Sequence, residues 1–189
     1  MPPKNPERPL LFLDACCIIN LFATGLIEEI LASLPYRLAT SRLVATREVL
    51  SIARIASPPD GPLEREVISP ARLENTENLA VLDLVTDAER ADFIRFTAEI
   101  DDGEASVCAL AVAHQGGVAT DDRRALRVLG RIAPRVPTVQ TPELFHDWAR
   151  LTRAPERTVK DVLRAVRLRA RFYPRRDAPC FEWWERYFR

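Results

Sequence analysis

Lysine is almost missing from this chain of 189 residues: among 27 cationic side chains, only Lys4 and Lys160 are lysines. A phosphoacceptor receiver domain needs a lysine after a late strand. Because Lys160 falls within a predicted helix, this class is excluded. The surplus of arginine suits bidentate phosphate contacts. Codon usage in a GC-rich genome explains the same bias more simply, so arginine content alone assigns no function.

Histidine and cysteine are too few and too unfavourably spaced for a structural zinc site. Only His114 and His146 occur, no Cys-x-x-Cys pair exists, and neither histidine is spaced from a cysteine in a zinc-binding pattern. We expect the cysteines to be reduced, mostly buried thiols of a cytoplasmic protein. The four cysteines are Cys16, Cys17, Cys108 and Cys180.

Long apolar runs are also missing. A membrane-spanning helix needs about 20 uncharged apolar residues, and the apolar stretch that starts at Leu10 is interrupted by Asp14 and Asn20. The first residues lack the arrangement of a secretory signal peptide, so we expect no membrane association. The formal net charge is zero, and it therefore indicates neither a nucleic acid nor a membrane surface as a partner.

What the chain does contain is an alternation of short apolar runs and amphipathic segments. Strands are predicted at 9–15, 36–40, 117–120 and 136–140, with weaker strand candidates at 65–70 and 79–85. Helices are predicted at 18–34, 41–56, 87–100, 121–133 and 141–151, with a small-residue helix within 101–117 and a loop at 57–62. This alternation predicts an α/β fold around a mostly parallel sheet. Residues 154–189 are rich in arginine and are expected to form a helical appendage to residues 1–153.

Carboxylates follow two of the predicted strands. An open parallel sheet places its binding crevice at the carboxyl ends of its strands. Asp14 lies at the end of the first strand, and Asp121 and Asp122 follow the strand at 117–120. Helix capping is the alternative role for Asp14 and for one of the two later aspartates. An isolated ionised carboxylate in an apolar run is costly unless something pairs with it.

Two further acidic positions lie on predicted helices. Asp101, Asp102 and Glu104 open the small-residue helix, where Asp101 and Asp102 can also favour the helix N-terminus electrostatically. Glu48 falls on the helix predicted after the second strand, on the face that carries Val44 and Ile52. A lone glutamate is most often a solvated surface residue. However, four separate segments each offer a carboxylate that the fold can bring to one place.

Converging carboxylates predict a bound cation. Two carboxylates about 4 Å apart repel by about 1 kcal/mol in water and by about 4 kcal/mol at an effective dielectric constant near 20. Several of them cannot all stay ionised without protonation or a cation. Oxygen ligands without histidine or cysteine suit Mg²⁺ or Mn²⁺. Such a metal activates water and stabilises negative charge on a phosphodiester.

Three segments together resemble a PIN-domain protein. They are "LLFLDACCIINLFATG", "LATSRLVATREVL" and "DDGEASVCALAVAHQGGVATDDRRALRVLG", and the resemblance runs in order over about 9–150. It implies that residues 1–153 form a three-layer α/β/α nuclease domain with a mostly parallel central sheet. Many such domains are Mg²⁺- or Mn²⁺-dependent ribonucleases, and a large share are toxins of toxin–antitoxin pairs of the virulence-associated-protein type. Residues 154–189 lie outside the resemblance.

The resemblance also implies a role for each acidic residue. Asp14 matches the first acidic ligand of the family, and Glu48 matches the second, which is carried on the helix after the second strand. Glu104 in the "GEAS" motif matches the third. Asp122 in "TDD" matches the fourth, with Asp121 as the alternative. These residues are the expected metal ligands and catalytic groups.

Neighbouring polar residues complete the expected site. Similar residues in the family orient the carboxylates by hydrogen bonding, and Asn20 and Thr120 are the candidates for this role here. Arg123 and Arg124, directly after the last acidic pair, are candidate RNA contacts. The resemblance implies RNA as the substrate, an antitoxin as a candidate protein partner, and a homodimer as a candidate oligomeric state.

Two other functional classes were weighed. A catalytically silent PIN-fold module that binds RNA or a protein partner remains open, because the family contains degenerate members. A haloacid-dehalogenase-like phosphatase needs a second aspartate two residues after its nucleophile. Cys16 occupies that place, so this class is discounted.

The C-terminal appendage has two candidate roles. From Arg150 to Arg189 there are eleven arginines and one lysine against five acidic residues. Arginines near aromatic residues suit a phosphate backbone and stacked bases. The spacing of Val162, Leu163 and Val166 favours packing against the core instead, with the arginines solvated on the other face. Packing or protein contact is the commoner role for such a segment, and both remain open.

Overall fold

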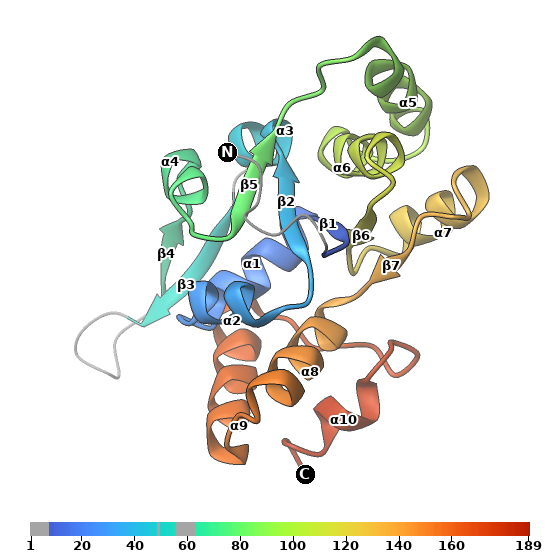
Figure 1. Ribbon diagram of the computed structural model, residues 1–189. Coiled ribbons are helices and arrows are strands. Elements are labelled where there is room, and N and C mark those ends of the chain that lie inside the picture. Colours follow the sequence, from blue (N-terminus) through green and yellow to red (C-terminus); the bar gives the residue numbers. More distant parts are fainter. Residues whose placement is uncertain (1–7, 49, 56–62) are drawn as a thin grey trace.

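A five-stranded parallel sheet forms the centre of the protein (Figure 1). The computed structural model describes residues 8–48, 50–55 and 63–189. The strands lie in the order β5-β2-β1-β6-β7, and every neighbouring pair is parallel. Their bounds are β1 Leu10–Leu13, β2 Arg37–Ser41, β5 Leu79–Leu82, β6 Gly117–Ala119 and β7 Thr138–Val139.

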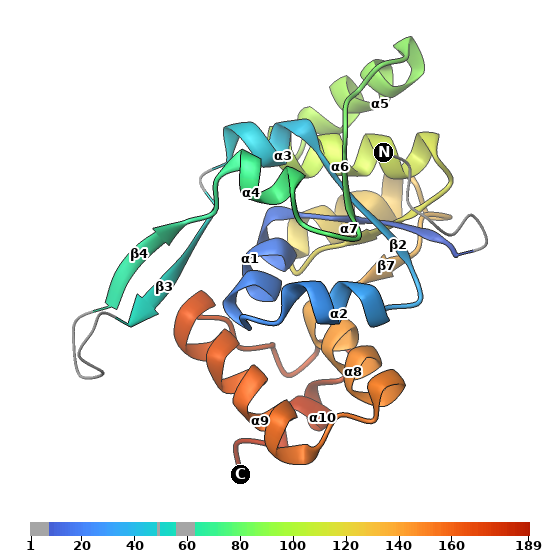
Figure 2. The same cartoon turned by 60° about the vertical axis from the view of Figure 1, so that its left-hand side comes forward.

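Helices cover both faces of this sheet (Figure 2). One layer contains α1 Ala15–Ala23, α2 Ile27–Ser33 and α8 Thr141–Thr152. The other contains α3 Arg42–Arg47, α5 Asp87–Thr97 and α6 Asp102–Ala113, and α7 Arg123–Ile132 contacts α6. The predicted α/β class and its three-layer α/β/α arrangement around a parallel sheet are confirmed.

The central strands are apolar because both of their faces are covered. All four residues of β1 are buried, as expected for a parallel strand between two helical layers. Helix α6 lies against β1, β2 and β6, and its sequence DGEASVCALAVA is dominated by small side chains. Small residues let the helix approach the sheet closely, and eight of its residues are buried. The first turn of α6, which carries Glu104, is thereby fixed relative to the strand ends.

The helix predicted at 18–34 is two helices. Helix α1 begins at Ala15, directly after its N-cap Asp14, and α2 starts again at Ile27. Between them Gly25 has a φ of 75°, a left-handed conformation that glycine adopts without steric cost. Among the described residues no single helix has the length and apolarity needed to span a membrane. Helices α1 and α2 meet those criteria only as a pair, which is bent by 117°.

The helix predicted at 41–56 is wrong beyond its first half. Helix α3 ends at Arg47, and its C-cap Glu48 is extended, with φ −85° and ψ 137°. The chain then forms β3 Ser51–Ile55, which pairs antiparallel with β4 Leu63–Val67 in a ribbon beside the main sheet (Figure 1). Glu48 therefore does not share a helical face with Val44 and Ile52. The loop predicted at 57–62 lies outside the described residues.

The remaining weak strand candidates were partly correct. β4 and β5 overlap the candidates at 65–70 and 79–85, and α4 Pro70–Glu74 connects them. The last predicted strand, at 136–140, is reduced to two paired residues in β7.

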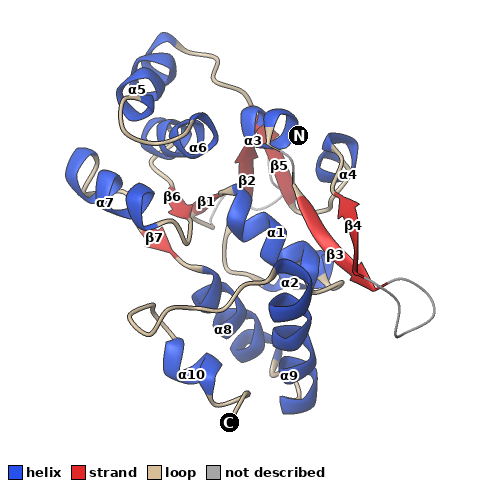
Figure 3. Ribbon diagram, turned by 180° about the vertical axis from the view of Figure 1, so that it is seen from behind, coloured by secondary structure: helices blue, strands red, loops and turns tan. Residues whose placement is uncertain are grey.

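The C-terminal segment packs against the α1, α2 and α8 side of the molecule (Figure 3). It contains α9 Glu156–Ala165, a π-helix at Val166–Ala170 and α10 Phe181–Glu185. Val162, Leu163 and Val166 are buried, which confirms the packing expected from their spacing. Arg169 donates hydrogen bonds to the carbonyl oxygens of Ala23 and Ala53, at 2.8 and 3.1 Å, and so ties the π-helix to α1 and β3.

Candidate metal centre

An acidic cavity of about 420 Å³ opens at the carboxyl ends of β1 and β6. The acidic residues that line it come from the loops and helix termini after four different strands or helices. They are Asp14, Glu48, Asp101, Glu104, Asp121 and Asp122. The structure thus brings together all five of the carboxylates that the sequence singled out as candidate ligands.

Asp14 is held firmly at the base of this cavity. It is 3% exposed, and its Oδ1 accepts a hydrogen bond from the Ala15 amide at 2.7 Å. Its Oδ2 accepts one from Thr120 Oγ1 at 2.8 Å. Burial raises the pKa of Asp14 despite these bonds. Helix capping and cavity lining are therefore both roles of Asp14.

Glu48 reaches the cavity from the end of α3, past Gly103 of α6. A Cβ atom at Gly103 would lie 1.6 Å from Glu48 Oε1 and 2.8 Å from Glu48 Cδ. Only a residue without a side chain leaves room for the carboxyl group in this position. Burial raises the pKa of Glu48, and the charges of Asp14 and Asp101 raise it further.

Glu104 has a strongly shifted carboxyl. Burial, and then the charges of Asp14, Asp122 and Asp101, raise its pKa from 4.5 to about 7. Asp101, the N-cap residue of α6, precedes Glu104 by three positions and therefore lies on the same side of the helix. Within the described part of the chain, no arginine or lysine forms an ion pair with Asp14, Glu48 or Glu104.

The two consecutive aspartates after β6 have different surroundings. Asp121 accepts hydrogen bonds from the amide and hydroxyl of Thr141, at 3.0 and 2.6 Å, and from Asn20 at 3.2 Å. Both of its oxygens are thus used to join β6 to α8 and α1. Asp122 caps α7 through Oδ1 alone, which accepts from the amides of Arg124 and Ala125. Asp122 is therefore the better candidate ligand, as the resemblance implied.

The two supporting residues act on different carboxylates. Thr120 donates to Asp14 and also accepts a hydrogen bond from the Asp122 amide at 3.1 Å. Asn20 donates to Asp121 and to Thr141. Thr120 thus orients a predicted ligand, whereas Asn20 orients the aspartate that serves mainly as a link between elements.

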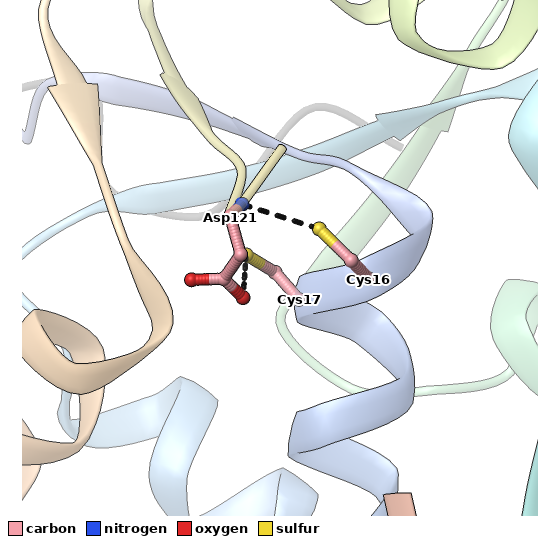
Figure 4. A group of neighbouring side chains, drawn as sticks. All are labelled: Cys16, Cys17 and Asp121. Atoms are coloured by element: carbon pink, nitrogen blue, oxygen red, sulfur yellow. Dashed lines mark hydrogen bonds between the residues drawn. The ribbon is translucent and has the colours of Figure 1, made fainter. Parts of the chain in front are cut away.

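Two thiols lie beside Asp121 (Figure 4). Cys16 and Cys17 come from the first turn of α1, and with Asp121 they form a group whose ligand atoms all lie within 4.8 Å of one another. The neighbouring Cys16 thiol, followed by burial, raises the pKa of Cys17 well above its ordinary value. Cys17 accordingly donates its S–H to Asp121 at 3.9 Å. Hydrogen bonds from Cys17 Sγ to Asp121 Oδ2 and from the Asp121 amide to Cys16 Sγ join this group.

The donor chemistry of the cavity fits a hard divalent cation. Asp14, Glu48, Glu104 and Asp122 offer carboxylate oxygens only, which Mg²⁺ and Mn²⁺ prefer over nitrogen or sulfur. Burial, and then their mutual repulsion, raises the pKa of three of them. A bound cation would relieve that repulsion.

No protein-family model and no curated protein matches this sequence. The relation to PIN domains therefore stays a resemblance of motifs. The function therefore has to be inferred from the residues and geometry of the acidic cavity itself.

Sequence reasoning missed two features of this site. It named Asp101 as an acidic residue at the start of a helix but not as a candidate ligand, although its spacing from Glu104 could have indicated a shared face. It also assigned no role to Gly103, because the contact with Glu48 joins distant segments. Arg123 and Arg124 are exposed in the first turn of α7, next to the cavity. Their proposed contact with RNA remains a prediction.

Proposed function

We propose that this protein is a divalent-metal-dependent endoribonuclease of PIN-domain type, acting as the toxin of a toxin–antitoxin pair. One observation carries the proposal. Four carboxylates from separate segments, Asp14, Glu48, Glu104 and Asp122, line one cavity at the carboxyl ends of the parallel strands. The order of these residues along the chain is that of the family which the sequence resembles.

Asp14, Glu48, Glu104 and Asp122 would hold Mg²⁺ or Mn²⁺. When bound, the metal supplies an activated water and stabilises the negative charge that develops on the phosphodiester. The chain's own contribution is preorganisation. The Ala15 amide and Thr120 hydroxyl fix the Asp14 carboxylate, and the α7 amides fix that of Asp122.

In the metal-free protein the pKa of the Glu104 carboxyl is about 7. A bound divalent cation would favour the carboxylate form and so lower that pKa, which leaves Glu104 the role of metal ligand in this proposal. An antitoxin would be expected to inhibit the enzyme in the cytoplasm of the cell.

The proposal is tested by cleavage of labelled single-stranded and structured RNA in Mg²⁺, in Mn²⁺ and in EDTA. We expect cleavage only with metal, and a loss of at least about 100-fold in Asp14→Asn and Glu104→Gln. Asp102→Asn is the matched control, because Asp102 lies in the same turn of α6 but does not line the cavity. Cleavage that survives EDTA and Asp14→Asn would contradict the metal mechanism. RNA binding without turnover would favour the catalytically silent module instead.

A further inference from the structure

Charge is separated between the two parts of the chain. Residues 154–189 carry ten cationic and five acidic side chains, a surplus of five positive charges. Because the formal charge of the whole chain is zero, the residues before them carry an equal negative surplus. A polyanion is repelled by an acidic surface and attracted by a basic one. The charge of the C-terminal segment therefore favours an anionic ligand such as RNA.

The C-terminal segment contains a cavity suited to an anion. It has a volume of about 500 Å³ and lies between α9, the π-helix and the last residues of the chain. Among the residues that the structure describes, no acidic side chain lines it. We call it the basic pocket, and the lining residues that matter here are Lys160, Arg164, Arg167, Tyr187, Phe188 and Arg189.

The cations of the basic pocket are arranged on a fixed scaffold. Lys160, Arg164 and Arg167 recur at helical spacing and therefore share one face. The opposite face of the same helix is anchored by buried residues, including Val162 and Leu163. Packing against the core already orders this helix. Binding a ligand therefore does not carry the entropic cost of ordering it.

Most of these cations are not neutralised by the protein. Across the described residues, Lys160, Arg164 and Arg167 form no ion pair, and Arg189 pairs only with the exposed Glu182, at 3.2 Å. An unpaired arginine cluster is the arrangement that binds phosphate groups.

Aromatic rings adjoin the same cations. The guanidinium of Arg167 lies over the rings of Tyr173 and Phe188, at 5.1 and 5.3 Å from their centroids. The side chain of Tyr173 is part of the surface, since this residue is 38% exposed. Tyr173 does not line the basic pocket, and Arg167 lies over its ring, so what this surface offers a single-stranded nucleic acid is phosphate contact by the unpaired cations. The acidic cavity of the proposed nuclease favours RNA over an acidic peptide as the occupant.

We infer that the basic pocket binds the phosphate backbone of single-stranded RNA and so recruits the substrate of the acidic cavity. This inference rests on the proposed function for the identity of the ligand. It assigns recruitment to residues 154–189, the part of the chain that lies outside the PIN-domain resemblance.

The test is RNA binding by the full chain in EDTA, where no cleavage is expected. The affinity for a fluorescent single-stranded RNA is measured by anisotropy at several salt concentrations. We expect Arg164→Gln/Arg167→Gln to weaken binding at least about tenfold. Losing two phosphate contacts should also reduce the slope of log affinity against log salt by about 1.4. Lys160→Gln/Arg164→Gln should act similarly while leaving Arg167 on its aromatic neighbours.

The matched control is Arg127→Gln/Arg135→Gln, which removes the same charge from exposed arginines outside the basic pocket. We expect it to change affinity less than about twofold. Equal weakening in both double variants, unchanged binding in the pocket variants, or no binding by the wild type would each overturn the inference. An acidic peptide that binds the basic pocket as tightly as RNA would also overturn the inference. Cleavage assays with metal are read separately, so an inactive enzyme that still binds RNA here would contradict only the proposed function.

Discussion

At the scale of single residues, the contact between Gly103 and Glu48 shows how a glycine can act on a carboxylate from another segment. The space that a side chain at Gly103 would occupy is filled by the Glu48 carboxyl group. Glutamate is flexible, so an added methyl group would displace the carboxyl rather than the backbone. The position of Glu48 in the cavity therefore depends on a residue that makes no polar contact with it.

The first prediction concerns this pair. We expect Gly103→Ala to move the Glu48 carboxylate out of the cavity and to lower Mn²⁺ affinity and RNA cleavage at least about tenfold, with little effect on folding. Gly130→Ala is the control, because nothing lies within 4 Å of a Cβ at Gly130 in α7. That change should stabilise the helix by about 0.5–1 kcal/mol and leave metal affinity unchanged. Unaltered metal binding by Gly103→Ala, measured by calorimetry, would contradict this role.

The second prediction concerns Glu104. Its pKa is about 7 in the folded, metal-free protein and near 4.5 when unfolded, so the folded state binds the proton more tightly. By linkage, the free energy of unfolding falls as pH rises from about 4.5 to 7, and the penalty is complete above that range. The penalty is about 1 kcal/mol once solvent screening of a partly exposed group is allowed for.

Glu104→Gln removes this penalty. In EDTA we expect its Tm to exceed that of the wild type by about 2–4 °C at pH 8 and to equal it at pH 4. Thermal unfolding followed by circular dichroism measures both values. Asp102→Asn should show no such pH-dependent gain. A gain of the same size at both pH values would mean that the titration of Glu104 is not its source.

Much of the site could be predicted from single residues, and the rest depended on tertiary contacts. Asp14 and Glu104 stood out because they interrupt apolar or small-residue stretches at strand and helix ends. The choice between Asp121 and Asp122 needed the hydrogen bonds of Thr141, which lies 20 positions further along. A sequence gives no direct sign of such a partner.

At the scale of elements, local patterns predicted the sheet better than the connections around it. Apolar runs identified β1, β2 and β6, because a buried strand requires them. The helix predicted at 41–56 failed because the pairing of β3 with β4 overrides the helical preference of its residues, and that pairing is not encoded in the segment itself. This difference matters for function, since it places Glu48 at the end of α3 and not on its apolar face.

The third prediction concerns Arg169, which joins the π-helix to α1 and to the β3–β4 ribbon. It donates to two carbonyl oxygens and lies 3.6 Å from Glu66. Arg169→Ala leaves both carbonyls without this donor, so we expect a loss of about 1–3 kcal/mol in the free energy of unfolding. Urea denaturation measures this loss in the free energy of unfolding. Arg157→Ala, an exposed arginine of α9 without an ion pair among the described residues, should change it by less than about 0.5 kcal/mol.

At the scale of the whole molecule, the acidic cavity and the C-terminal segment are expected to unfold together. Trp184 of α10 is fully buried against Phe145 of α8 and Phe172, at ring centroid distances of 5.9 and 5.6 Å. Helix α8 is in turn joined to the cavity through the hydrogen bonds between Thr141 and Asp121. A continuous path of contacts thus links the tryptophans to the candidate metal ligands.

The last prediction uses this coupling. All three tryptophans lie in α8 and α10, whereas metal would bind at the strand ends. Mn²⁺ at about 100 times its Kd should stabilise the folded state by about 2.7 kcal/mol, which raises the Tm by about 5–10 °C. We expect the molecule to unfold as one unit, so tryptophan fluorescence and far-ultraviolet circular dichroism should report the same shift. Asp14→Asn should abolish the shift and Asp102→Asn should retain it. A shift seen by circular dichroism alone would mean that the C-terminal segment unfolds independently of the metal centre.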